Sequence, residues 1–262
     1  MSTDSSNEWC ELVTDEYLGV CAMFWRMFIH RLIDAEELIK RSNEAVARAK
    51  DAMMKAGSVI RIGTSPMTPA EVLVELWPKL SKIMPGLKFQ LVPFDNTPVN
   101  ARMILKNLGE NIDVVAGIFD ESLLSYRECD AIELSKERLC VAFSVNHPLA
   151  AKTRLSIKDL YGQELMMLKA GRMKNMDGLR EYLTRSHPQV RIVDFPLYNL
   201  DVFNACENGQ RLLVTIDRWR TVHPLLKTVR MGWKFEMPYG LMYSKTPDAK
   251  VSEFLDALKT VF

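Results

Sequence analysis

The sequence predicts an α/β protein built as two lobes, and three observations support this. From residue 58 onward, short apolar segments typical of strands alternate with amphipathic segments typical of helices. That spacing indicates βαβ crossovers and a mostly parallel sheet. The alternation occurs in two successive blocks with no Gly/Ser-rich linker between them, which favours two lobes joined by strands that cross from one to the other. A length of 262 residues suits such a unit.

Each element has its own pattern in the printed sequence. In the first block, strands are expected at 58–64, 87–95 and 112–119, and helices at 68–84 and 97–109. In the second block, strands are expected at 136–145, 164–168, 190–197 and 211–216, and helices at 175–186 and 200–209. A strand at 239–245 and an amphipathic helix at 249–262 close the chain, the helix with Val251, Phe254, Leu255, Leu258 and Val261 on one face.

Residues 34–57 differ from both blocks and predict one long helix. Ala, Glu, Lys and Arg dominate there, and Gly57 fits the C-cap position. The narrow apolar stripe suits a linker or a paired helix better than a core. Residues 1–31 stay unassigned; a short helix that docks on the body or on a second subunit is favoured over a basic membrane-surface helix, since few basic residues occur there.

Composition narrows the class of protein. An apolar share of 48% and a charged share of 26% fit a globular chain, and a net charge of +1 gives no argument for or against nucleic acid. The cysteines are scattered and never spaced as CxxC, which argues against a disulfide framework or a zinc site. The N-terminus lacks a secretory signal pattern, and its most apolar run is too short to span a bilayer. We expect a cytoplasmic protein without a membrane partner.

Catalytic motifs are absent from the sequence. It contains no GxSxG, GxxxxGK[ST], HExxH or GxGxxG segment at a strand–helix turn. His147, His187 and His223 each precede proline, which favours turns. The sequence therefore predicts no enzyme and no cofactor or metal.

Three turns combine a strand end with a helix start and so suit a polar ligand. They contain Thr64–Ser65, Asn96–Thr97, and a loop with Lys169 and Arg172. Free N–H groups and the positive end of the helix dipole converge at such points. The basic loop suits a carboxylate or phosphate. The alternative for each turn is a plain helix cap.

Taken together, these segments resemble the effector-binding domain of LysR-type transcriptional regulators. The resemblance rests on "IRIGTSPMTPAEVLVELWPKLSKIMPGLKFQLV", on "LKNLGENIDVVAGIFD", and most specifically on "LCVAFSVNHPLAAKTRLSIKDLYGQELMML" with its "HPLA" motif. Residues 32–57 are similar to the family's linker helix, although Ile33 and Glu36 depart from its opening pattern. The segment "CENGQRLLVTIDRW" also departs from the family, because Arg211 lies near the position of a second glycine.

The resemblance implies a fold and a domain division. It implies two α/β subdomains of the periplasmic-binding-protein type (type 2), with a long N-terminal linker helix at 32–57 and an effector-binding domain at 58–262. Subdomain I would comprise about 58–135 and 245–262, and subdomain II about 136–244. The winged helix-turn-helix that precedes this helix in the family has no recognisable counterpart in the sequence. DNA therefore stays open as a partner, reached either through an unrecognised N-terminal segment or through pairing with a complete regulator.

The resemblance also implies a site and partners. A small effector would bind between the subdomains, and the chain would form a homodimer or a heteromer with a related regulator. The expected effector contacts are Thr64, Ser65, Asn96, Thr97, Gly117, Ile118, Lys169, Arg172, Asn199, Leu200 and Thr215. The alternative function is a small-solute-binding protein of the same fold with no regulatory role, which the missing signal sequence disfavours.

Overall fold

The computed structural model describes residues 39, 42–43, 45–46 and 59–261. The chain divides into two units, Met1–Gly57 and Ser58–Phe262. The expectations for residues 1–31 and for the linker helix at 32–57 fall outside the described residues, apart from five exposed helical positions between 39 and 46. No helix of the described residues is long and apolar enough to cross a membrane.

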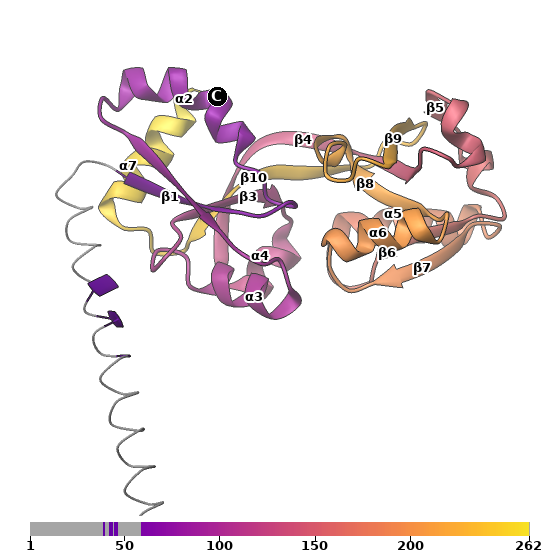
Figure 1. The fold of residues 1–262 in the computed structure, drawn as a ribbon, viewed down its shortest axis with the longest axis horizontal. Helices are drawn as coiled ribbons and strands as arrows, with labels where there is room; N and C mark the ends of the chain where they lie inside the picture. The colour runs from indigo at the N-terminus through magenta and orange to yellow at the C-terminus, as the bar shows by residue number, and fades with distance from the viewer. Residues whose placement is uncertain (1–38, 40–41, 44, 47–58, 262) are drawn as a thin grey trace, which may run out of the picture. The chain divides into compact units, whose positions relative to one another are not determined.

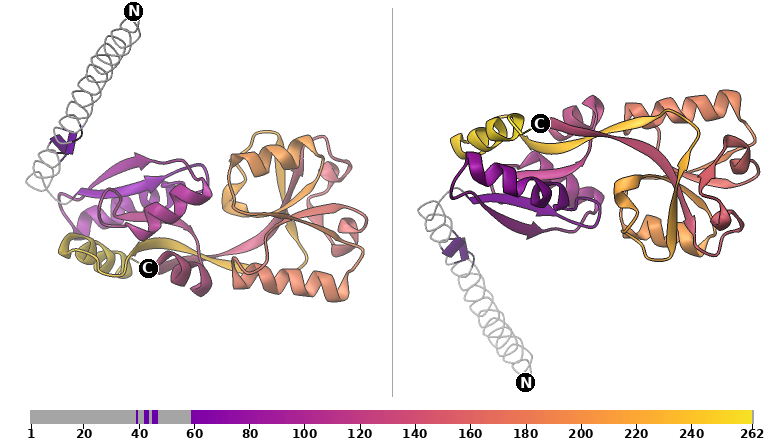
Figure 2. Two further views of the ribbon diagram at one scale, coloured as in Figure 1. Left: turned by 90° about the horizontal axis from the view of Figure 1, so that it is seen from below. Right: turned by 90° about the horizontal axis from the view of Figure 1, so that it is seen from above.

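The unit Ser58–Phe262 consists of two lobes joined by two long strands (Figures 1 and 2). The first lobe contains β1 (Val59–Thr64), α2 (Glu71–Ile83), β2 (Lys88–Pro93), α3 (Pro98–Lys106), β3 (Val114–Ile118), α4 (Glu121–Arg127) and α7 (Ala249–Lys259). The second lobe contains β5 (Arg154–Leu155), β6 (Glu164–Leu168), α5 (Lys174–Ser186), β7 (Arg191–Phe195), α6 (Leu200–Asn208), β8 (Leu212–Ile216), β9 (Leu226–Met231) and the 3-10 turns η1 (Pro148–Ala151), η2 (Ile157–Leu160) and η3 (Asp217–Trp219). The joining strands are β4 (Cys129–Ser144) and β10 (Glu236–Ser244).

The strands follow the order β2-β1-β3-β10-β4-β8-β6-β7, with β9 also paired to β4 and β5 to β9. In the first lobe β1 pairs in parallel with β2 and β3, and in the second lobe β6 pairs in parallel with β7 and β8. The carboxyl ends of these parallel strands are where an α/β sheet offers space for a ligand. The predicted class, an α/β fold of two lobes with crossing strands, is confirmed.

The two joining strands lie unusually close to each other. β10 pairs antiparallel with residues 129–138 of β4, and the register shifts between Tyr239 and Gly240. A Cβ atom on Gly240 would lie 1.9 Å from the carbonyl oxygen of Ile132. Glycine is therefore required at this point, because any side chain would push the two backbones apart.

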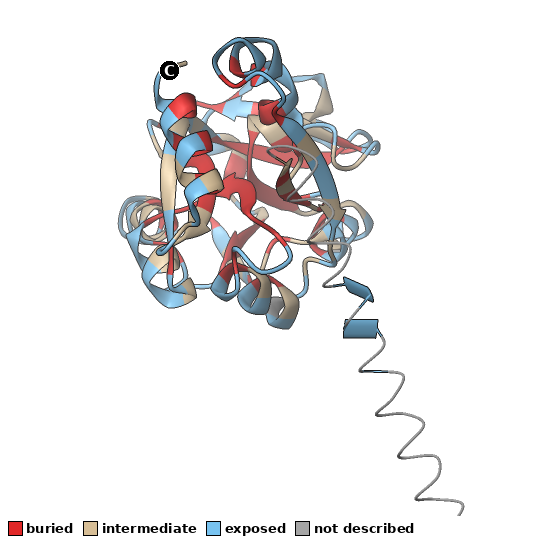
Figure 3. Cartoon of the chain, turned by 90° about the vertical axis from the view of Figure 1, so that its left-hand side faces the viewer, coloured by how far each residue is buried: buried red, intermediate tan, exposed pale blue. Residues whose placement is uncertain are grey.

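Helices cover the sheet of the first lobe with their apolar faces. The strands beneath them are mostly buried, and the outer faces of the helices are exposed (Figure 3). The buried residues of α2 are Val72, Leu73, Leu76 and Leu80, and those of α7 are Val251, Phe254, Leu255, Ala257 and Leu258. Pro78 is tolerated inside α2 because the carbonyl that loses its partner belongs to Val74, which is exposed. Asp248 caps α7 by accepting a hydrogen bond from the Val251 N–H at 2.7 Å.

Several expected elements differ from those observed. The predicted strand at 136–145 is only the second part of β4, whose first part was not predicted. Helix α4 and the strands β5 and β9 were not predicted either. After the buried Cys129, the first part of β4 contains only half-buried and exposed residues, so its apolar signal is weak.

A buried carboxylate ties three elements of the first lobe together. The side chain of Asp113, just before β3, is fully buried and accepts hydrogen bonds from the Arg61 backbone N–H at 2.8 Å and from the Lys250 ammonium at 2.9 Å. The Arg61 guanidinium, on β1, also pairs with it. Burial by itself would raise the pKa of Asp113, but the hydrogen bonds from Arg61 and Lys250 hold that pKa below its ordinary value.

We therefore expect the substitution Asp113→Asn to lower the free energy of unfolding by about 2–4 kcal/mol, because it leaves two cations facing a neutral amide. A lowered folded-state pKa stabilises the fold above the unfolded-state value of about 4. The difference between wild type and variant should thus be full at neutral pH and shrink as the pH falls through the folded-state pKa. Urea denaturation at several pH values measures it.

The matched control is Asp256→Asn on α7, since Asp256 forms an exposed ion pair with Lys259. It should leave the unfolding curve unchanged. Equal effects of the two substitutions would show that the Asp113 cluster does not stabilise the first lobe.

Candidate functional site

A cavity of about 230 Å³ lies between the two lobes. The first lobe and β10 contribute Met67, Thr68, Phe94, Asn96, Ala101, Arg102, Leu105, Val115, Gly117, Ile118, Ser122, Leu123, Tyr126, Arg127 and Met242. The second lobe contributes Leu168, Gly171, Arg172, Met173, Pro196, Leu197, Tyr198 and Trp219. Lining residues lie at or just after the carboxyl ends of β1, β2, β3, β6, β7 and β8, which is the position expected for a ligand in this kind of sheet.

The loop after β1 forms a tight turn that places Thr68 at the cavity. The Thr68 N–H donates to the Ser65 carbonyl oxygen at 2.9 Å, and the two hydroxyl groups are 2.8 Å apart. Helix α2 begins later, with Ala70 as its N-cap and no side-chain cap. The alternative interpretation of Thr64 and Ser65 as helix caps is therefore wrong.

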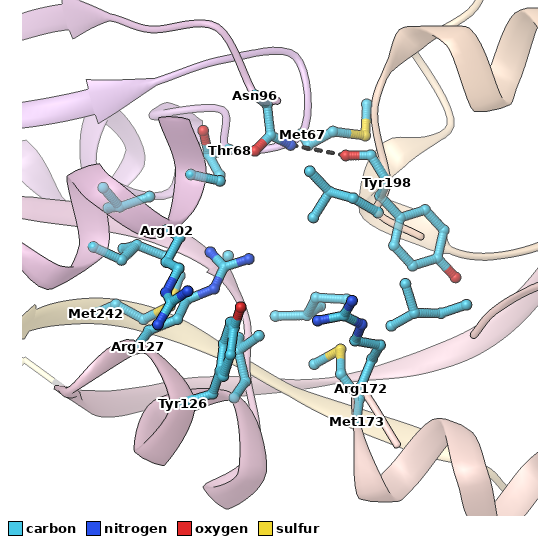
Figure 4. Close-up of a pocket in the computed structure, with 18 of the residues that line it drawn as sticks. Met67, Thr68, Asn96, Arg102, Tyr126, Arg127, Arg172, Met173, Tyr198 and Met242 are labelled. Carbon is cyan, nitrogen blue, oxygen red and sulfur yellow. Dashed lines mark hydrogen bonds between the residues drawn. The ribbon is translucent and has the colours of Figure 1, made fainter. Parts of the chain in front are cut away.

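Two hydrogen bonds join the lobes across the cavity. The Asn96 side-chain amide donates to the Tyr198 carbonyl oxygen at 2.8 Å (Figure 4). The Trp219 indole N–H donates to the Met67 carbonyl oxygen at 3.1 Å. The Trp219 ring is buried and packs on Tyr198, with the ring centroids 4.8 Å apart. These contacts hold the lobes together on the side of the cavity formed by the loops after β1 and β2.

Gly117, in β3, leaves space at the back of the cavity. A Cβ atom there would lie 3.2 Å from the terminal methyl group of Met242 and 3.7 Å from the Thr68 side chain. Apolar side chains surround this space, among them Leu105, Val115 and Ile118. The inner part of the cavity therefore suits an apolar group.

Three arginines give the cavity a positive charge, and they are called the arginine cluster below. Arg102 lies on α3, Arg127 ends α4, and Arg172 lies in the loop after β6. The lining contains no aspartate or glutamate. Within residues 59–261, none of the three forms an ion pair. The site therefore favours an anion on electrostatic grounds.

The charge of Arg127 is the least well solvated of the three. Burial lowers the pKa of its guanidinium from the ordinary value, and the nearby charge of Arg172 acts in the same direction. Among the described residues, its buried Nε atom has no hydrogen-bond partner. Pairing with an anion would offset this cost of burial.

Tyr126, on α4, lies between the arginines of the two lobes (Figure 4). The Arg102 guanidinium carbon is 4.9 Å from the centre of its ring, and that of Arg172 is 6.0 Å away. Cation–π attraction of this kind holds a guanidinium without neutralising it. The ring thus keeps both cations at the cavity while leaving their N–H groups for a ligand.

Four residues that were predicted as effector contacts line the cavity: Asn96, Gly117, Ile118 and Arg172. They come from the loop after β2, from β3 and from the loop after β6. The other seven predicted contacts, Thr64, Ser65, Thr97, Lys169, Asn199, Leu200 and Thr215, do not line it.

Local structure accounts for most of these seven. Thr97 and Asn199 are the N-caps of α3 and α6, where each side chain accepts a backbone N–H. Thr215 is fully buried within β8. Ser65 reaches the cavity only through its hydrogen bond with Thr68.

The sequence analysis missed most of the charged and aromatic lining. Arg102, Tyr126, Arg127, Tyr198 and Trp219 were not predicted. Asp120, which caps α4 by accepting a hydrogen bond from the Leu123 N–H at 2.9 Å, was a signal for that helix. The convergence of the three arginines depends on contacts between lobes and had no local signal.

Metal-ligand and nucleophilic side chains were sought at the cavity and elsewhere in the described residues. Within the described residues, no group of three or more His, Cys, Asp or Glu side chains could hold a metal ion. No histidine or cysteine of residues 59–261 lines the cavity.

Comparison with known proteins identifies the class. The model of the LysR substrate binding domain matches residues 55–262. The structure is similar to CbnR, a LysR family transcriptional regulator, with a TM-score of 0.60 and 14% identity over 87% of this chain and 78% of that one. It is also similar to the effector-binding domain of QuiR in complex with shikimate, with a TM-score of 0.56 and 16% identity over 78% of this chain and 97% of that one. A third similar structure is the oxidised form of OxyR, with a TM-score of 0.53 and 17% identity over 78% of this chain and 94% of that one. A comparison with curated protein sequences found no relative.

The fold and the cavity define an effector-binding domain of the periplasmic-binding-protein type. The chain belongs to the LysR family of transcriptional regulators, and its domain at residues 55–262 is the LysR substrate binding domain.

The hydrogen bond from the Asn96 amide to the Tyr198 carbonyl oxygen should stabilise the observed arrangement of the lobes. Replacing Asn96 with Ala removes it and should make separation of the lobes easier by about 1 kcal/mol. The Trp219 indole N–H, which bonds across the cavity, should then exchange with solvent about fivefold faster in an NMR exchange measurement.

Two controls accompany this measurement. The Trp233 indole N–H donates to the Leu139 carbonyl oxygen at 2.6 Å, and neither residue lines the cavity. The exchange rate of this N–H should not change. Asn100→Ala is the matched variant, because within the described residues the Asn100 side chain makes no hydrogen bond. Faster exchange of both indoles would indicate general destabilisation and contradict the role of the Asn96 hydrogen bond in holding the lobes together.

Proposed function

We propose that this chain is a cytoplasmic, non-enzymatic regulator that senses a small-molecule effector in the cavity between its lobes. The observation that carries the proposal is a cavity enclosed by both lobes and lined by three arginines without ion-pair partners in residues 59–261. A volume of about 230 Å³ is below the range of about 300–1,000 Å³ typical of drug-sized ligands, so a metabolite fits best.

The proposed contacts follow from the lining. Asn96, Gly117, Ile118 and Arg172 would touch the effector directly. Ser65 would act through Thr68, whose side chain it positions. Thr64 would contribute through the backbone, since its carbonyl oxygen accepts the Phe94 N–H at 3.0 Å and so sets the wall after β2.

Sensing would work through the arrangement of the lobes. An effector that contacts both lobes stabilises the closed arrangement over an open one. The size of the shift equals the difference between its binding free energies for the closed and the open arrangement. The strands β4 and β10 would act as the hinge because they are the segments that run from one lobe to the other.

The change would be passed on through partner subunits. We propose that the chain forms a homodimer or pairs with a related regulator, and that DNA is reached through such an assembly. Val74 and Trp77 on α2 and Leu91 on the edge strand β2 are exposed apolar residues that would suit pairing through the first lobe.

A reducing compartment agrees with the cysteines of the described residues. Cys129, Cys140 and Cys206 are buried and unpaired. Burial raises the pKa of the Cys129 and Cys140 thiols to about 11 and that of Cys206 to about 12. Thiols that stay protonated at neutral pH are unreactive, which supports a structural role.

The function is tested by blocking the cavity. Ser122, on α4, is exposed and lines the cavity, so Ser122→Trp should fill it without disturbing the core. In a thermal-shift screen of aromatic acids, amino acids and sugar phosphates, the wild type should gain stability with its effector by mass action. The Ser122→Trp variant should lose that gain.

The matched control is Ser125→Trp, on the same helix but outside the lining. It should keep the stabilisation. If Ser122→Trp responds to every compound as the wild type does, the effector does not bind in this cavity.

A further inference from the structure

We infer that the ligand of the cavity is a small organic acid with two negative charges, one held by Arg102 and Arg127 of the first lobe and the other by Arg172 of the second. The inference rests on the proposed function and adds the chemical class of the effector. It follows from three features of the cavity: the pairing of its arginines, their placement on opposite lobes, and the apolar walls behind them.

The arginine cluster stands out from the other arginines of the chain. Every other arginine in residues 59–261 takes part in an ion pair, with the exception of Arg154. Arg154 lies on β5, in the second lobe, and does not line the cavity. The three arginines without a carboxylate partner at the cavity are therefore a feature of the site and not of the surface in general.

Arg127 is half-buried, and no carboxylate of residues 59–261 forms an ion pair with it. Its Nε atom is buried and makes no hydrogen bond in the described part of the chain. A guanidinium presents a fork of N–H groups that matches a carboxylate or a phosphate in two parallel hydrogen bonds. An acidic group at this position would satisfy the orphaned N–H and offset the charge.

Two acidic groups are needed because the charge lies on both lobes. Arg102 and Arg127 come from neighbouring helices, while Arg172 faces them with the Tyr126 ring between (Figure 4). A single acidic group bound by the first pair would leave Arg172 unpaired. A second group on the same molecule would bind Arg172 and connect the lobes, which replaces repulsion between them by attraction.

The walls define the rest of the ligand. Behind the arginines, Leu105, Ile118 and Met173 present apolar surface, and Gly117 leaves room for it. At the opposite end Thr68 lines the cavity with a hydroxyl group and Asn96 with an amide oxygen, since its amide nitrogen bonds to Tyr198. A compact carbon skeleton, such as a ring or a short chain, would occupy the middle.

The test compares ligands that share a skeleton and differ only in charge. Isothermal titration calorimetry of the full chain would use phthalate, phthalamate and phthalamide, and in parallel succinate, succinamate and succinamide. In at least one series the dianion should bind with millimolar affinity or better. Each replacement of a carboxylate by an amide should weaken binding about tenfold or more, and added salt should weaken the dianion most.

Variants then assign the charge to residues. Arg127→Gln and Arg172→Gln should each weaken the dianion about tenfold or more while leaving the diamide unchanged. Arg154→Gln is the matched control, because it removes an arginine that is unpaired in residues 59–261 and lies away from the cavity; it should have no effect. Thermal melts of each variant without ligand verify that the chain is folded.

The outcomes separate this inference from the proposed function. If the diamides bind as tightly as the dianions, or if Arg127→Gln and Arg172→Gln have no effect, the dianion class is wrong. Binding of a neutral compound that Ser122→Trp abolishes would then still support the cavity as the effector site. Absence of millimolar binding by either dianion also overturns the inference, whereas binding that survives Ser122→Trp overturns the proposed function.

Discussion

The close pairing of β4 with β10 is the constraint on which the rest of the molecule depends. These strands run from one lobe to the other (Figure 1). The absence of a side chain at Gly240 lets their backbones approach. Because β4 pairs with β10 in the first lobe and with β8 and β9 in the second, it sets how the lobes face each other. The cavity exists because this pairing brings the carboxyl ends of two parallel sheets together.

The charges of the cavity depend on the same arrangement. Arg127 ends a helix that leads directly into β4, so its position follows from the strand that joins the lobes. Arg172 reaches the same space from the other lobe and is held by the Tyr126 ring. Opposed like charges without a carboxylate lining the space favour separation of the lobes, whereas the hydrogen bonds from Asn96 and Trp219 favour closure. Binding of an anion would offset the repulsion between the arginines and shift the equilibrium toward the closed arrangement of the lobes.

The sequence predicted the lobes well because their elements have local signals. The terminal helix shows its buried face at the helical period, and the strand at 164–168 contains the continuous apolar run 165–168. The site was predicted less completely. Its aromatic and charged residues come from segments that meet only after both sheets form, and α4 is too short for its periodicity to be read. Turn residues such as Thr97 and Asn199 carry the same signal whether they cap a helix or bind a ligand, and the structure places them as caps.

The most direct measurement of the central claim is the NMR signal of each arginine Nε–H in ¹⁵N-labelled protein, recorded while the acid that stabilises the chain most is added. We expect the signals of Arg102, Arg127 and Arg172 to shift together and saturate at one equivalent, because one ligand pairs with all three. The signal of Arg154, outside the cavity, should stay in place. Shifts of Arg154 equal to those of the arginine cluster, or no shift of Arg127, would contradict the account.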